Sequence, residues 1–334
     1  MGAGTLAQAL AEGHVSAEAH GLRRVVLLTL GIFYQATYAN QLKARDIALE
    51  QLRREGVLAV DARTPVAEWP RPLATLYDNL GRPRAPHRDG DQGAYGICNR
   101  LTFMYGAPYV EDRLVPEIHR DTWTLRFRAG RRRPEIGDVL YGADSAAEAD
   151  LARLGPTSGV WSRGDAAGEM ILFGGDRLAF KPGEDLLCRG ERVATVDAAR
   201  FSEAQLPCQF GAIPLRMYEH GARNVRRGFA GCFEDRSDCR LIEPGHARRF
   251  MDGLDAVTLI TGCENRLWHP RSIGLMHEWL LNSGREARGR CARHVVSGFG
   301  HQDLLWGSDA REKVFPLILE GLGGRQPDAE HGAP

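Results

Sequence analysis

The sequence predicts an α/β protein in which helices alternate with the strands of a parallel sheet. Three short apolar runs, near 25–30, 256–261 and 293–298, are the predicted strands. Val25–Leu30 is a continuous β-rich run, which is typical of a strand buried on both faces. Because helical patterns separate these runs, we expect right-handed crossovers that bring all three strands into one parallel sheet.

Apolar residues at helical spacing predict the helices of this core. The predicted helices are Gly2–Glu12, Gln41–Glu55 (ended by Gly56), Arg271–Asn282 and Asp309–Leu322. Residues 1–56 and 251–322 are therefore assigned to the core, and the polar segment 323–334 to a disordered tail.

The region 57–250 has a different character, because Pro and Gly are frequent and basic stretches interrupt the pattern. We predict that it forms a large mixed α/β insertion, a cap over the carboxyl ends of the strands. Four short apolar runs near 160–200 predict an antiparallel β-meander within it: Met170–Phe173, Arg177–Phe180, Asp185–Cys188 and Arg192–Val196. Ile213–Gly228 is predicted to be a helix with a basic end.

Composition excludes several classes of function. Lys and Arg total 43, as do Asp and Glu, so the zero net charge offers no reason to bind nucleic acid or an anionic membrane. The longest apolar run, Val25–Tyr34, is too short to span a bilayer, and the amino terminus lacks the pattern of a signal peptide. Seven scattered cysteines without a CxxC motif predict reduced thiols in a cytoplasmic protein, although Cys232 and Cys239 could pair in an oxidising compartment.

No cofactor or metal site is expected. Gly2, Gly4 and Ala7 match the spacing of a dinucleotide fingerprint, but no strand precedes them in the sequence. His269 has no companion at zinc-ligand spacing.

His301 is the most informative candidate for chemistry. It follows Gly298 and Gly300 in a turn between the last predicted strand and the last helix. Such a turn would place the ring over the carboxyl edge of a parallel sheet, where active sites of open α/β sheets are built. An imidazole there is suited to proton transfer. A structural histidine that hydrogen-bonds a loop is the alternative.

Three segments resemble the α/β-hydrolase superfamily of lipases and esterases. His301–Trp306 is similar to its terminal histidine turn, H-x-D-x-x-W, and Thr261–Pro270 to the loop that carries its catalytic acid. Arg100–Gly106 resembles a segment of the hydrolase domains fused to cholesterol-oxidase-type GMC flavoproteins. The resemblance implies a partial α/β-hydrolase fold and hydrolysis of a small-molecule, bulky apolar ester by a nucleophile, a histidine and an acid.

The sequence departs from this family at the nucleophile. No G-x-S-x-G elbow is present, and Met1–Leu6 resembles the residues that follow such a nucleophile, with Gly2 as the final glycine of the motif. The nucleophile is then expected one position before Met1, so the chain as given should be incomplete and inactive. The alternative is a non-catalytic half-protein that associates with a partner chain along the apolar edge Val25–Leu30.

The acid position also differs. Asn265 stands where the family usually has Asp, and its amide can orient the ring but cannot stabilise an imidazolium. Glu264 beside it is the first candidate for the acid. Asp303 is a further candidate. Because it lies only two residues after His301, it is better placed to brace the turn.

Overall fold

The computed structural model describes residues 2–80, 96–106, 121–173, 179–203, 211–232 and 240–324. The chain forms two compact units. The first combines residues 1–84, 99–114 and 212–334, and the second combines 85–98 and 115–211. The region 57–250, expected to form a cap, therefore contributes to both units. The expected tail lies outside the described residues apart from Gly323 and Gly324.

A parallel sheet organises the first unit. Its strands are β1 (Arg24–Leu28), β10 (Ala256–Gly262) and β11 (Cys291–Val296), in the order β1-β10-β11. Both pairings are parallel, with Leu28 opposite Ile260 and Ile260 opposite His294. The three predicted strands and their parallel arrangement are thus confirmed. Their carboxyl ends meet at one edge of the sheet.

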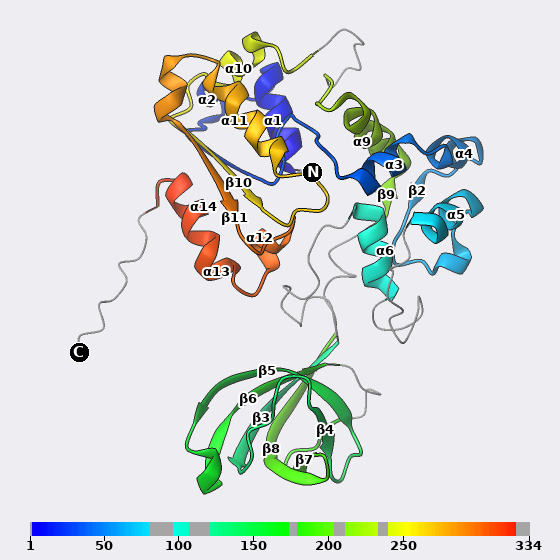
Figure 1. Cartoon of the computed structure of the whole chain (residues 1–334), viewed down its shortest axis with the longest axis vertical. Coiled ribbons are helices and arrows are strands. Elements are labelled where there is room, and N and C mark those ends of the chain that lie inside the picture. The colour runs from blue at the N-terminus through cyan, green and yellow to red at the C-terminus, as the bar shows by residue number, and fades with distance from the viewer. Residues whose placement is uncertain are drawn as a thin grey trace. The chain divides into compact units, whose positions relative to one another are not determined.

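Helices cover both faces of this sheet (Figure 1). One face packs against α1 (Gly2–Glu12), α10 (Pro244–Met251) and α11 (Arg271–Leu281), with α2 (Ala17–His20) and η5 (Arg285–Gly289) nearby in the chain. The other face packs against α12 (Asp303–Trp306), α13 (Ala310–Lys313) and α14 (Phe315–Gly321). The single helix predicted for 309–322 breaks at Val314, because Pro316 has no amide proton with which to continue the hydrogen bonds of α13.

A group of shorter elements completes the first unit. These are α3 (Tyr38–Arg45), α4 (Ala48–Arg54), β2 (Ala59–Val60), η1 (Val66–Glu68), α5 (Arg71–Leu80), α6 (Gly96–Tyr105), β9 (Ile213–Pro214) and α9 (Leu215–Arg227). The helix predicted for 41–55 is divided into α3 and α4. The cause is Asp46, whose carboxylate accepts a hydrogen bond from the amide of Ala48 at 2.7 Å and starts a new helix there.

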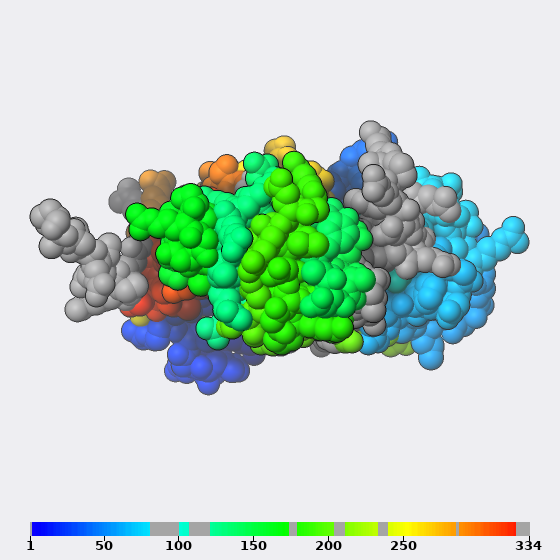
Figure 2. Space-filling view, turned by 90° about the horizontal axis from the view of Figure 1, so that it is seen from below, coloured from blue at the N-terminus to red at the C-terminus, as the bar shows by residue number. Residues whose placement is uncertain are grey.

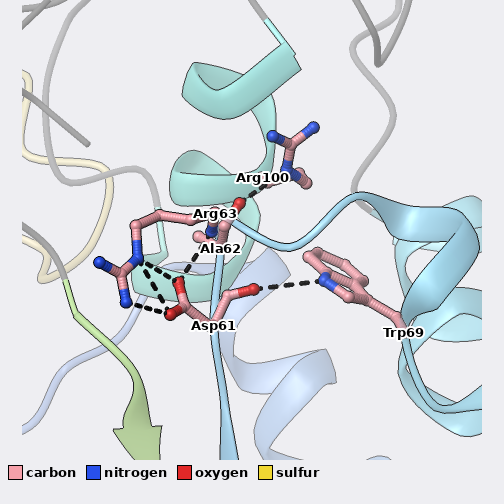
Figure 3. Close-up of polar contacts among 5 residues, drawn as sticks. All are labelled: Asp61, Ala62, Arg63, Trp69 and Arg100. Atoms are coloured by element: carbon pink, nitrogen blue, oxygen red, sulfur yellow. Dashed lines mark hydrogen bonds and ion pairs between the residues drawn. The ribbon is translucent and has the colours of Figure 1, made fainter.

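The loop after β2 anchors α6 (Figure 3). Arg100 of α6 is buried and donates to the carbonyl oxygen of Ala62 at 2.6 Å, while the indole of Trp69 donates to the carbonyl oxygen of Asp61 at 3.3 Å. Arg63 hydrogen-bonds the carboxylate of Asp61 and lowers its pKa. The hydrogen bond from Arg100 attaches α6 to this loop, and with it most of the segment Arg100–Gly106 that the sequence analysis singled out.

The second unit contains a closed antiparallel barrel. Its strands are β3 (Thr122–Gly130), β4 (Val139–Gly142), β5 (Glu148–Ser158), β6 (Ala166–Phe173), β7 (Asp185–Cys188) and β8 (Glu191–Ser202), in the order β3-β6-β5-β4-β7-β8. Figure 2 shows the outer surface of these strands in green. Apolar side chains fill the interior, among them Leu125, Leu140, Leu151, Met170, Leu172 and Leu186.

The predicted meander is therefore part of a larger structure. Runs 170–173, 185–188 and 192–196 do fall in β6, β7 and β8. The run 177–180 is different: residues 177 and 178 lie outside the described residues, and Phe180 is buried but belongs to no strand.

The cysteines differ in their oxidation state. Cys188, Cys263 and Cys291 are free thiols, but Cys232 is disulfide-bonded, so the expectation of reduced thiols throughout is wrong. No helix within the described ranges has both the length and the apolar character needed to cross a membrane.

Candidate functional site

Two loops at the carboxyl edge of the sheet are joined by backbone hydrogen bonds. The amide of Cys263 donates to the carbonyl oxygen of Val296 at 2.9 Å, and that of Glu264 donates to Phe299 at 3.0 Å. Gly262 allows this approach, because a Cβ there would lie 1.9 Å from the carbonyl oxygen of Phe299. The turn that carries His301 is thereby held against the end of β10.

Asp303 braces the same turn. Its side chain is fully buried and accepts a hydrogen bond from the amide of Gly300 at 2.7 Å. A charge-assisted hydrogen bond of this length is a strong local constraint. The contact fits the bracing role expected for Asp303.

The His301 ring contacts one polar side chain at each nitrogen. Its Nε2 lies 3.4 Å from Oγ1 of Thr29, and its Nδ1 lies 3.4 Å from Nδ2 of Asn265. Both contacts are long for hydrogen bonds and therefore weak. Burial lowers the pKa of His301 to about 3, so the ring is neutral near pH 7.

Asn265 presents its amide nitrogen, not its oxygen, to the ring. Its Oδ1 accepts hydrogen bonds from the backbone amides of Leu267 at 3.1 Å and Trp268 at 2.9 Å, which fixes the orientation of the buried side chain. Because Nδ2 can only donate, this contact favours the tautomer in which Nδ1 of His301 accepts and the ring proton lies on Nε2. A general base needs Nε2 without a proton, so this tautomer opposes catalysis.

Thr29 is a site residue that the sequence analysis missed. It follows β1, is buried, and has a φ of 72°, which is a strained value for a β-branched residue. The apolar run Val25–Leu30 concealed it. The available signal was a hydroxyl at the carboxyl end of a buried parallel strand, the edge where His301 was expected.

Glu264, the first candidate for the acid, has an exposed side chain. No hydrogen bond between described residues joins it to His301, whereas Asn265 and Thr29 both reach the ring. The structure thus brings together three residues, His301, Asn265 and Thr29, with Asp303 bracing the turn.

A largely apolar cavity of about 650 Å³ borders His301 within the first unit. Gly2 of α1 and Leu28 of β1 also line it, as do Phe103 of α6 and Trp268. Behind Phe103 lies an aromatic cluster, in which its ring is 6.2 Å from Trp69 and 5.1 Å from Tyr77. Such a cavity suits a bulky apolar ligand.

Among the residues that the structure describes, no group of three or more His, Cys, Asp or Glu side chains is arranged to hold a metal ion. No model of a protein family matches this chain, and neither a curated protein nor a solved structure is significantly similar to it.

Proposed function

We propose that this chain belongs to an ester hydrolase of the lipase/esterase kind with an α/β-hydrolase fold, in which His301 transfers the proton. The observation that carries the proposal is the position of His301. It stands at the carboxyl edge of a parallel sheet, contacts Asn265 at the expected acid position, and lines an apolar cavity.

The proposed reaction is acyl transfer. A nucleophilic hydroxyl or thiol attacks the ester carbonyl while His301 accepts its proton, and His301 then returns that proton to the departing alcohol. Water next attacks the acyl-enzyme in the same way and releases the acid. We place the nucleophile of this reaction at the amino end of α1, because Gly2 and His301 line the same cavity.

The cavity supports a bulky apolar acyl or sterol-like ester as substrate, because Phe103, Trp268 and Leu28 contribute to its lining. Asn265 supports low activity at best, since its neutral amide cannot stabilise an imidazolium.

The test compares ester hydrolysis by two forms of the protein. One is the chain of 334 residues, and the other is a form that begins further upstream in the same reading frame. With p-nitrophenyl esters of increasing acyl length, we expect background rates from the first form. From the second we expect turnover that His301→Ala abolishes and that the exposed control His14→Ala leaves intact. Turnover that survives His301→Ala in either form would refute the proposal.

A second candidate is a non-catalytic half-protein that binds a partner chain. The tautomer imposed by Asn265 favours it, as does β1, which forms an edge of the sheet in the described structure. A stop codon directly upstream of Met1, together with a stable complex captured at the β1 edge, would favour this candidate over the hydrolase.

A further inference from the structure

We propose that the cavity beside His301 recognises a carboxylate on an elongated apolar molecule, through Lys43 and Tyr218. This inference rests on the proposed function, because hydrolysis of an apolar ester by water yields an alcohol and an acid of this kind. The bound carboxylate would then be a product of the proposed reaction. Binding itself can be measured without turnover.

Lys43 of α3 brings a positive charge into the cavity. Its Nζ donates to the carbonyl oxygen of Phe103 at 2.8 Å and lies 4.9 Å from the centre of the Phe103 ring. An ammonium has three donors, so further donors remain for a ligand. Burial lowers the pKa of Lys43 to about 8, which leaves it largely charged near pH 7.

No Asp or Glu in the described lining of the cavity compensates this charge. The described residues that line the cavity include no Asp or Glu, and no described residue forms an ion pair with Lys43. The other titratable groups of the lining are His301, His220 and three tyrosines: Tyr34, Tyr105 and Tyr218. The cavity is therefore positive and favours an anion.

Tyr218 of α9 supplies a second donor. Its hydroxyl is buried and has no hydrogen-bond partner among the described residues, although the side chain lines the cavity. Burial raises its pKa, so it stays protonated and can donate. Buried hydroxyls nearly always have a partner, and a ligand oxygen would provide one here.

Together these features define the ligand class. A carboxylate has two oxygens and can accept hydrogen bonds from an ammonium and a phenol at once. Most of the remaining lining is apolar and suits a hydrocarbon body, with contributions from Leu49, Leu73, Leu215 and Val225. A neutral alcohol of equal length would satisfy the apolar lining but not Lys43.

The test is calorimetric binding of dodecanoate and of dodecanol, below their aggregation limits, to the chain of 334 residues. We expect dodecanoate to bind saturably and about tenfold or more tightly than dodecanol, because only the acid forms charge-assisted hydrogen bonds. Lys43→Met should weaken dodecanoate binding about tenfold and leave dodecanol binding unchanged. Tyr218→Phe should weaken dodecanoate binding about threefold to tenfold.

The matched controls are Lys313→Met and Tyr38→Phe. Lys313 is an exposed lysine that pairs with Asp309, and Tyr38 is an exposed tyrosine. Tyr218→Phe removes an oxygen that has no hydrogen-bond partner among the described residues. It should therefore preserve the fold even if Lys43→Met does not. Equal affinities for acid and alcohol, or an unchanged dodecanoate affinity in both cavity variants, would overturn the inference. The two tests are independent. Failure of carboxylate binding would not contradict the hydrolase proposal, and the absence of His301-dependent turnover would not contradict carboxylate binding.

Discussion

The side-chain nitrogen of Asn265 lies 3.4 Å from Nδ1 of His301, while its oxygen is held by the amides of Leu267 and Trp268. This arrangement keeps the ring proton on Nε2, the nitrogen that also faces Thr29. The contact with Asn265 therefore favours the tautomer of His301 in which Nε2 cannot serve as a base.

Asn265→Asp should move that proton. One carboxylate oxygen can retain the two backbone amides, and the other then accepts from Nδ1–H. The negative charge also favours imidazolium, so the pKa of His301 should rise from about 3. NMR of the ring nitrogens reports both changes. The exposed Glu264→Gln is the control; an unchanged tautomer in Asn265→Asp would contradict the geometry.

Gly262→Ala should destabilise the first unit by about 3 kcal/mol or more, as expected for overpacking against backbone. The added Cβ would lie 1.9 Å from the carbonyl oxygen of Phe299 and force the His301 turn away. Urea unfolding measures the loss. Gly245→Ala in α10, where a Cβ meets nothing within 4 Å, should instead be neutral or stabilising. A harmless Gly262→Ala would show that the two loops do not meet as described.

The stability of the protein should fall in acid because of His301. Its pKa is lowered from 6.5 to about 3 on folding, so between these values the unfolded chain binds a proton that the folded chain does not. The contribution is a loss of up to about 2 kcal/mol on going from pH 7 to pH 5. His301→Gln should reduce this loss in urea unfolding at the two pH values, and the exposed His14→Gln should not. Equal acid sensitivity in all three proteins would show that the ring is not buried as neutral imidazole.

Dodecanoate affinity should fall as the pH rises above about 8, because Lys43 loses its proton there. A bound carboxylate favours the charged form, so the fall is shifted toward higher pH in the complex. Tyr34, Tyr105 and Tyr218 have raised pKa values and stay neutral over this range. Calorimetry at several pH values tests the effect. Lys43→Met should show no such fall; a fall of the same size in that variant would assign the titration to another group.

Local patterns were sufficient to predict the core. The apolar runs gave β1, β10 and β11, and the spacing in Gly2–Glu12 gave α1 with its observed ends. The glycines around His301 correctly indicated a turn at the sheet edge. Each of these features is encoded within a few neighbouring residues, which is why periodicity and turn chemistry reveal them.

Other features depend on contacts distant in sequence. Closure of the barrel requires β3 to pair with both β6 and β8, and no local pattern specifies those partners. The direction of the loop after Gly262 is also set by the fold, which buries Asn265 and leaves Glu264 exposed. The positive φ of Thr29 is likewise imposed by the surrounding fold.

The most direct test of the hydrolase proposal is kcat/KM for a p-nitrophenyl ester, measured on the N-terminally lengthened protein, its Asn265→Asp variant, and the double variant Asn265→Asp/His301→Gln. We predict that Asn265→Asp raises kcat/KM about tenfold or more, and that the additional loss of His301 reduces it about a thousandfold. A rate that does not depend on His301 in the Asn265→Asp background would contradict the role assigned to this residue.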